Sequence, residues 1–468
     1  MLRAAFRAHR DSSRGVTAGK TVSTRQPADL LIEARWLLPI APANVALAEH
    51  ALAVSAGRIL AVGPAAELRE RFEARELVVR SRHVLLPGLV NAHTHASHAL
   101  LRGLPVRGPR SSWLRETLAP IERRCLSADF VRDGTRLALA EMLRAGITCF
   151  ADLSLHPEEA ARAAAAAHVR AAIALPVSEA PTPWAESATA HLARAERLWD
   201  EYRSDPRIAL YFAPLVSHGV SEALLTRVRR VADELDARIA LHLEEFAALT
   251  EPSGPGPQGA PGVEDSARAP PGSGWLRQLR SLGLLRAGFT AIGATVCDEA
   301  DLELLARHGA SVVSCPQADL RLGARVPVVA RGVDRGALGT DSPAAAGALD
   351  VLTEARTAAL VCGVDAAQAL RMATLGGAAA LGLAARIGSL EPGKAADLAC
   401  IDLGGLSGAP GSGVHDAIVF GAARGQVSDV WTAGRAALCA GRLVALDEEE
   451  LATLPMRWAE RIGMEAAA

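Results

Sequence analysis

Short apolar runs alternate with alanine-, leucine- and arginine-rich stretches through the middle of this chain. The stretches between the runs fit amphipathic helices, as at 127–145 and 221–235. Eight such strand–helix units predict an α/β fold, a parallel (β/α)₈ TIM barrel. An open doubly wound sheet is the alternative, but no glycine-rich phosphate-binding fingerprint follows the first strand. The apolar runs that we expect to be barrel strands are 85–92, 147–152, 170–176, 208–214, 238–243, 289–294, 311–315 and 336–340.

Strand-like segments also occur at both ends of the chain. They lie at 29–32 and 51–62 near the N-terminus and at 397–402 and 430–443 near the C-terminus, with glycine turns between them. Strands at both ends that enclose a long middle predict a small β-sandwich domain built from the two chain ends. The expected division is 28–86 with 385–450 for this domain and 87–384 for the barrel.

Three further segments have no place in either domain. We expect 1–27 to be a disordered tail; the first 26 residues, whose single acid is Asp11, also have the composition of an organellar transit peptide or an over-extended start. The stretch 250–275 is rich in proline and glycine and predicts a flexible insertion near the barrel mouth, either a lid or disordered filler. Residues 451–468 are expected to form a C-terminal helix and tail.

Composition narrows the function classes. The chain has 468 residues, half of them apolar, and a net charge of −2, which fits a large barrel plus a smaller domain and gives no nucleic-acid footprint. No apolar run is long enough to span a bilayer. The seven cysteines are scattered without a C-x-x-C pair, which favours a reducing compartment, and we expect a cytoplasmic protein. A small molecule is the expected partner, and the sequence allows a homo-oligomer.

Candidate metal ligands follow the ends of three expected barrel strands. His93 and His95 stand two residues apart after the first strand, so their imidazoles would leave the same face. His242 ends the fifth strand, and Asp341 follows the eighth. Barrel enzymes place their chemistry at the carboxyl ends of the strands. Three imidazoles and a carboxylate predict one Zn²⁺ per subunit, with Fe²⁺ or Mn²⁺ as alternatives.

Two carboxylates are candidates for the catalytic chemistry. Asp341 could bind the metal and also accept a hydrogen bond from an attacking water. Glu245, three residues after His242, could point at the substrate and carry a proton to a ring nitrogen. Its neighbour Glu244 is the competing choice, and the three-residue offset favours Glu245.

These residues and their surroundings resemble the amidohydrolase superfamily over nearly all of 28–465. Within it, the chain is most similar to the 5-methylthioadenosine/S-adenosylhomocysteine deaminases, near the triazine hydrolases and guanine deaminases. The resemblance rests on several specific stretches, which are Pro87-Gly-Leu-Val-Asn-Ala-His-Thr-His, Leu101-Arg-Gly-Leu, Phe130-Val-Arg-Asp-Gly-Thr, Gly146-Ile-Thr-Cys-Phe-Ala-Asp, Leu338-Gly-Thr-Asp, Arg371-Met-Ala-Thr-Leu-Gly-Gly and Ile387-Gly-Ser-Leu-Glu-Pro-Gly-Lys-Ala-Ala-Asp-Leu.

The resemblance implies hydrolytic deamination of an aminopurine nucleoside by a metal-bound hydroxide, with Glu245 as proton carrier. His93, His95, His242 and Asp341 match the family's metal ligands. Glu122 matches the acid that such enzymes direct at the ribose hydroxyls; alternatively it is a solvated helix charge beside Arg123 and Arg124. Glu245, Trp113 and His218 complete the expected substrate-binding set.

The chain departs from the family pattern at the other strand ends. Gly293 stands where the family has a histidine that hydrogen-bonds the attacking water, and no histidine lies between His242 and His308. Losing a general acid or base costs about 10²–10⁴ in rate. The family's substrate histidine after the fourth strand is replaced by Leu215, and after the seventh strand stand Gln317 and Asp319.

Two additional histidines, His98 and His218, lie on loops expected at the barrel mouth. One of them could replace the missing proton shuttle; the alternative is that both are solvated loop residues. These departures leave two other functions open. One is a hydrolase of another amino-heterocycle, such as a triazine, and the other is a metal-binding relative that has lost catalysis.

Overall fold

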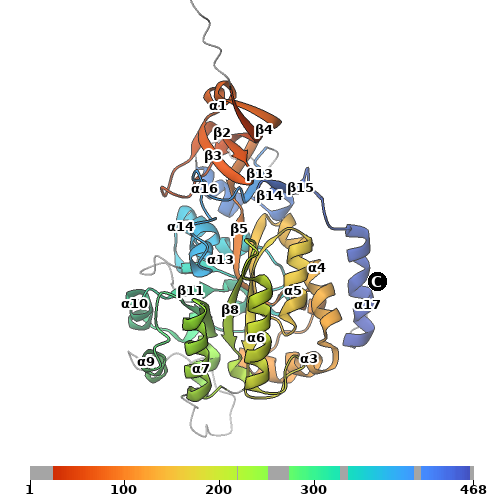
Figure 1. Ribbon diagram of the computed structural model, residues 1–468, viewed down its shortest axis with the longest axis vertical. Coiled ribbons are helices and arrows are strands. Elements are labelled where there is room, and N and C mark those ends of the chain that lie inside the picture. Colours follow the sequence, from red (N-terminus) through yellow and green to blue (C-terminus); the bar gives the residue numbers. More distant parts are fainter. Residues whose placement is uncertain (1–24, 219, 251–272, 327–335, 405–412, 464–468) are drawn as a thin grey trace, which may run out of the picture.

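The computed structural model describes residues 25–218, 220–250, 273–326, 336–404 and 413–463 (Figure 1). Most of the expected tail 1–27 and of the expected insertion 250–275 therefore lies outside the described residues. Within the described parts, no helix combines the length and apolarity needed to cross a membrane.

A parallel barrel forms the centre of the molecule. The candidate site residues lie at the carboxyl ends of its strands. Its strands lie side by side in chain order. The eight strands are β5 (Leu89–Thr94), β6 (Ile147–Asp152), β7 (Arg170–Val177), β8 (Ile208–Pro214), β9 (Arg238–His242), β10 (Phe289–Ile292), β11 (Ser311–Ser314) and β12 (Gly336–Leu338). The barrel closes where the chain after β12 meets β5, because the amides of Thr340 and Asp341 both donate to the His93 carbonyl, at 2.9 and 3.1 Å.

Helices follow the strands and cover the outside of the barrel (Figure 1). Ser127, Ser187 and Ser221 cap three of them, because each serine hydroxyl accepts a hydrogen bond from an amide of the first turn. The helices of the barrel region are α2 (Arg110–Trp113), α3 (Ala119–Cys125), α4 (Ala128–Arg144), α5 (Pro157–Ala166), α6 (Ala188–Tyr202), α7 (Glu222–Glu234), α8 (Leu243–Thr250), α9 (Gly274–Ser281), α10 (Glu299–Arg307), α11 (Pro316–Arg321), α12 (Pro343–Ala346), α13 (Val351–Cys362), α14 (Ala366–Arg371) and α15 (Gly377–Ala380).

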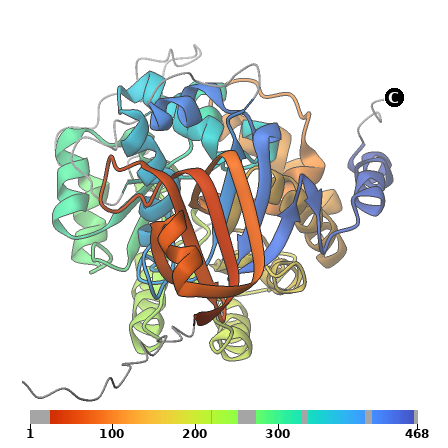
Figure 2. The same cartoon turned by 90° about the horizontal axis from the view of Figure 1, so that it is seen from above.

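The two chain ends form a second, mixed sheet of eight strands above the barrel (Figure 2). Its halves join where β13 runs antiparallel to β4. In spatial order the strands are β16 (Arg442–Leu443), β15 (Arg435–Cys439), β14 (Val427–Thr432), β13 (Leu398–Asp402), β4 (Phe72–Pro87), β1 (Gln26–Leu37), β2 (Leu47–Ser55) and β3 (Arg58–Pro64). The predicted fold, a barrel with a β domain from both ends, is confirmed.

Strand β4 was the part of this sheet that the sequence pattern did not reveal. Its first ten residues are rich in Arg and Glu and largely exposed, so they lack the apolar run used to find the other strands. The expected first barrel strand, 85–92, also proves to be two elements. It divides at Gly88, where an added Cβ would lie 2.1 Å from the Thr148 hydroxyl, so the chain passes from one sheet to the other at a glycine.

Two short helices and one long C-terminal helix complete the description. The helix α1 (Ala65–Arg71) connects β3 to β4, and α16 (Val414–Asp416) precedes β14. The C-terminal α17 (Glu448–Ile462) packs against α4, where the Trp458 indole donates to Asp133 at 3.1 Å. An expected C-terminal helix is therefore present, and its division from the neighbouring domain stays a prediction.

Candidate active site

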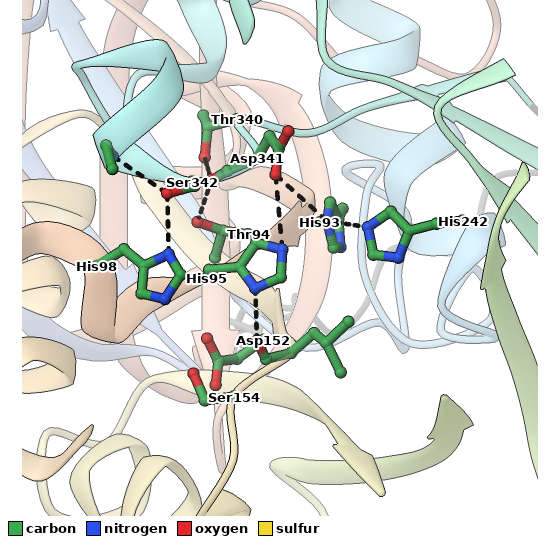
Figure 3. Close-up of polar contacts among 12 residues, drawn as sticks. His93, Thr94, His95, His98, Asp152, Ser154, His242, Thr340, Asp341 and Ser342 are labelled. Atoms are coloured by element: carbon green, nitrogen blue, oxygen red, sulfur yellow. Dashed lines mark hydrogen bonds and ion pairs between the residues drawn. The ribbon is translucent and has the colours of Figure 1, made fainter. Parts of the chain in front are cut away.

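Three histidine side chains converge at the carboxyl end of the barrel (Figure 3). His93 lies in β5, His95 directly follows it and His242 ends β9; one ring nitrogen of each lies within 4.8 Å of the other two. The Nε2 atoms of His93 and His242 are 3.2 Å apart. Asp341 reaches the same point, with Oδ1 3.8 Å from Nε2 of His93 and 3.5 Å from Nε2 of His95. The structure thus brings together all four side chains expected to bind a metal.

The seam between β5 and β12 fixes Asp341 opposite the histidines. Asn91 holds Thr340 at two atoms, accepting from its amide at 3.0 Å and donating to its hydroxyl at 2.8 Å. Gly339 lies so close to His93 that an added Cβ would be 2.7 Å from the His93 carbonyl oxygen. Asp341 itself has φ +53°, in the left-handed region that few residues other than glycine adopt. The surrounding hydrogen bonds stabilise Asp341 in this unfavourable backbone conformation.

His95 has its orientation set by its second ring nitrogen. The Nδ1 atom lies 2.7 Å from the carbonyl oxygen of Leu153, directly after β6, and donates to it when Nδ1 carries the proton. This contact leaves the Nε2 lone pair for a ligand, as is usual for metal-binding histidines. Asp152, at the end of β6, accepts from the amide of Ala96 at 2.7 Å and so fixes the chain just after His95.

The protonation of the three rings suits metal binding. Burial lowers the pKa of His95 and His242 to about 4, and it lowers that of His93 further. The rings are therefore neutral at neutral pH, the form that binds a cation. Three converging neutral imidazole nitrogens and one carboxylate oxygen fit a divalent transition metal such as zinc.

An arginine that the sequence interpretation did not include completes this side of the site. Arg110, the first residue of α2, donates from Nη1 to Oδ2 of Asp341 at 2.7 Å and from Nη2 to Oδ1 of Asp319 at 3.1 Å. Its Nε lies 3.2 Å from Oε2 of Glu244. No pattern in the glycine- and proline-rich stretch before α2 marks this residue. Asp152, in contrast, could have been found, because it ends a barrel strand as the expected ligands do.

A small cavity is lined by this arginine and by His242. Both candidate glutamates line it, and burial raises the pKa of each. They differ in their partners: Glu244 faces Arg110 and accepts from the Thr295 hydroxyl at 3.2 Å, whereas Glu245 has a hydrogen bond with Ser217. Glu244 is therefore engaged in an ion pair at the cavity wall. This contact favours Glu245 for proton transfer, as the sequence interpretation did.

The carboxylates around Arg110 respond to it differently. Burial raises the pKa of Asp319 to about 7, although Arg110 opposes this effect. Burial would also raise the pKa of Asp341, but Arg110 and the three imidazoles outweigh it and lower that pKa below its usual range. Asp341 is thus the firmly ionised member of the group, as a metal ligand must be.

Gly293 leaves open space on the same cavity. It has φ +65°, and a Cβ added there would meet no heavy atom within 4 Å. The position that the resemblance assigns to a histidine therefore holds no side chain. Leu215, at the other changed position, is half-buried and packs against the apolar residues of the barrel interior.

His98 and Glu122 form a pair beside the metal ligands. His98 places Nε2 3.1 Å from Oε1 of Glu122 and Nδ1 2.9 Å from the Ser342 hydroxyl, and its ring stacks on His95 with centroids 5.2 Å apart. Only 4% of His98 is exposed, so its interpretation as a solvated loop residue is wrong. Glu122 accordingly has a buried partner and is more than a solvated helix charge.

The remaining expected substrate residues are placed less directly. Trp113 is buried in the apolar core, and its indole donates to the Pro105 carbonyl at 3.1 Å. Both observations describe a structural role. His218 ends the short helix Val216–His218, but its side chain lies outside the described residues. A substrate role for either residue stays a prediction.

A parallel barrel with three imidazoles and a carboxylate at its mouth is the arrangement found in barrel hydrolases that use a metal ion. The comparison with known families is specific. The chain belongs to the amidohydrolase family, whose model matches residues 84–437. Residues 51–72 also match a bacterial imidazolonepropionase-like composite domain.

Curated relatives cover almost the whole chain. A protein of Teredinibacter turnerae named 5-methylthioadenosine/S-adenosylhomocysteine deaminase is 34% identical, over 93% of this chain and 98% of its own. One of the same name from Saccharophagus degradans is 33% identical, over 95% and 99%. The family assigned from sequence resemblance is thereby confirmed.

Solved structures agree on the fold. The zinc-bound crystal structure of an adenosine deaminase from Xanthomonas campestris has a TM-score of 0.87 and 38% identity, covering 94% of this chain and all of the other. The zinc complex of atrazine chlorohydrolase from Arthrobacter aurescens has a TM-score of 0.80 at 20% identity, covering 92% of this chain and all of the other, and so shows the fold alone.

Proposed function

We propose that this protein is a metal-dependent hydrolytic deaminase of an aminopurine nucleoside, of the 5-methylthioadenosine or S-adenosylhomocysteine type. The observation that carries the proposal is the convergence of His93, His95, His242 and Asp341 next to a cavity lined by Glu245. The names of the curated relatives supply the substrate class.

The four converging side chains would hold a divalent cation, zinc in the first place and iron or manganese as alternatives. Bound there, the cation would lower the pKa of a water molecule to roughly 7 and so supply the nucleophile. Asp341 has one oxygen toward the imidazoles. Burial keeps the imidazoles neutral, and the Arg110 guanidinium helps to keep Asp341 ionised, as metal binding requires.

Glu245 would carry the proton from the nucleophile to the substrate ring. Burial raises its pKa, so it holds and releases a proton closer to neutral pH than an exposed glutamate does. Addition of water across the ring C–N bond and loss of ammonia then need one group that moves a proton within the cavity. No histidine at Gly293 assists, so the carboxylates would do more of this work than in other family members.

Glu122 would bind the sugar hydroxyls, with His98 fixing its carboxylate. Trp113 and His218 stay proposed substrate-binding residues. Trp113 would act by holding α2, which also carries Arg110, against the preceding segment, since its indole donates to the Pro105 carbonyl. A cytoplasmic location and a homo-oligomer also stay predictions.

A second candidate is a hydrolase of a bulkier amino-heterocycle. The open space at Gly293 favours it, because a cavity that lacks a histidine side chain can accept a larger ring. The third possibility, a metal-binding protein without turnover, requires that the site bind its cation and leave every substrate unchanged.

The zinc-loaded protein should be assayed on 5-methylthioadenosine, S-adenosylhomocysteine, adenosine and an aminotriazine, following ammonia release and the change in purine absorbance. Turnover of a nucleoside, absent in His242→Asn prepared in parallel, supports the proposal. Activity on the triazine alone supports the second candidate. Full zinc occupancy with no turnover of any substrate contradicts both.

A further inference from the structure

Arg110 is the charged group of the site to which the proposed function gives no role. It follows Pro109 at the start of α2, and only 11% of its side chain is exposed. Its guanidinium faces three carboxylates, those of Asp341, Asp319 and Glu244. A buried guanidinium is unfavourable unless it is paired and hydrogen-bonded, so these contacts define where it lies.

The contact with Asp341 divides the two oxygens of that carboxylate between two partners. Oδ2 accepts from Arg110 at 2.7 Å, whereas Oδ1 lies 3.5 Å from Nε2 of His95. A carboxylate held at one oxygen cannot rotate freely about its Cβ–Cγ bond. Arg110 therefore fixes which oxygen of Asp341 faces the imidazoles.

The contact with Asp319 fixes Arg110 in turn. Nη2 donates to Oδ1 of Asp319 at 3.1 Å, and Asp319 is fully buried on α11. The guanidinium thus bridges α11 and the segment after β12. It does so at the cavity where Gly293 contributes no side chain.

We propose that Arg110 is a positioning residue of the metal site: it orients Asp341 toward the three imidazoles, and Asp319 holds it in place. This inference rests on the metal site of the proposed function. Arg110 donates hydrogen bonds but does not accept a proton at neutral pH, so it replaces the missing histidine as a donor and a charge, and leaves proton transfer to Glu245.

Two opposite effects of Arg110 on metal binding need to be weighed. Repulsion between the guanidinium and a divalent cation weakens binding, but three carboxylates surround the guanidinium and offset its charge. Orientation of Asp341 strengthens binding, because the cation then meets a preformed ligand. Loss of a hydrogen-bonding partner of a metal ligand typically weakens metal affinity about 10–100-fold. We expect orientation to dominate.

The test compares the zinc affinity of three variants with that of the wild-type protein, by competition with a chromophoric chelator. Arg110→Met removes the guanidinium and keeps the side-chain length, and should weaken zinc binding about 10–100-fold. Arg110→Lys keeps the charge and should recover part of the loss. Arg170→Met is the matched control: Arg170 is more deeply buried than Arg110 and is also paired with an aspartate, Asp397, at 2.9 Å, between β7 and the segment before β13. It should lose stability and keep the wild-type zinc affinity.

Zinc binding to folded Arg110→Met that is unchanged or tighter overturns the inference. If Arg110→Met does not fold, Asp319→Ala decides instead, since it leaves the contact with Asp341 but removes the oxygen that accepts from Arg110; wild-type affinity in that variant also overturns the inference. Failure of the wild-type protein to bind zinc at all contradicts the proposed function instead, and so the two failures are distinguishable.

Discussion

The two sides of the barrel mouth are built in different ways. On one side, the ends of β5, β9 and β12 supply His93, His95, His242 and Asp341, the residues expected from strand-end position alone. On the other, the chain after β10 and β11 supplies Gly293 and Asp319, and Arg110, the first residue of α2, reaches into the site. One side thus keeps the four residues expected from the family pattern, whereas the other lacks the expected histidine and holds a guanidinium that donates to Asp341.

The largest effect should come from removing a ligand on the histidine side. His93→Ala removes one of the three converging ring nitrogens, the one on the most deeply buried ring. Zinc affinity should fall by more than the ~10–100-fold expected for a mere partner of a ligand, and turnover should fall to the assay background. Metal content after dialysis measures the first and ammonia release the second. Retained zinc at full occupancy would show that His93 is not a ligand.

Replacing the proposed proton carrier should slow turnover without loss of metal. Glu245→Gln keeps the size of the side chain and removes its proton-transfer ability, so kcat should fall about 10²–10⁴-fold. Zinc occupancy should not change. Glu244→Gln is the control, because that residue pairs with Arg110 in the same cavity. A larger loss of kcat in the Glu244 variant would reverse the assignment of the two carboxylates.

An imidazole placed at position 293, on the Arg110 side of the cavity, should not increase kcat. Gly293→His must adopt φ +65°, which costs about 1–2 kcal/mol for a residue with a Cβ, and its ring would share a cavity with Arg110. Unfolding free energy should drop by that amount, and kcat should not rise. Gly363→His has nearly the same φ, +66°, and open space at the exposed end of α13, so it controls for the backbone strain. A clear rise in kcat for Gly293→His alone would show that the vacant position limits the rate.

The last effect concerns stability rather than turnover, as a change in how the free energy of unfolding depends on pH. The pKa of Asp319 is raised to about 7 in the folded protein, against about 3.9 in an unfolded chain. The folded state therefore binds the proton more tightly, so this group stabilises folding below pH 4 and the stabilisation is lost as pH rises toward 7. Asp319→Asn should flatten the curve in that window by up to about 1.4 kcal/mol per pH unit. Urea titrations of metal-free protein at pH 5, 6 and 7 measure it; parallel curves for the two proteins would contradict the prediction.

The sequence predicted the parts of the site that follow a regular rule. Apolar runs located all the barrel strands, and polar residues at their carboxyl ends, such as His242 and Asp341, located the side chains that converge at the barrel mouth. The exposed first part of strand β4 escaped because Arg and Glu residues interrupt its apolar positions. Arg110 escaped because its role depends on a long side chain reaching Asp341 and Asp319, more than 200 positions away in the chain. Contacts of that kind come from tertiary structure, which local patterns do not contain.

The pairing of β13 with β4 determines when this protein can fold. The mixed sheet is complete only after Leu443, at the end of β16, has been synthesised. Asp397 must also be synthesised before it can pair with Arg170 of the barrel strand β7, at 2.9 Å. Strands β1 to β4 therefore leave the ribosome long before the strands that complete their sheet. Such long-range pairings slow folding and leave β1 to β4 with an unprotected edge in the meantime. A nascent chain of this protein should accordingly depend on chaperones until its C-terminal strands are released.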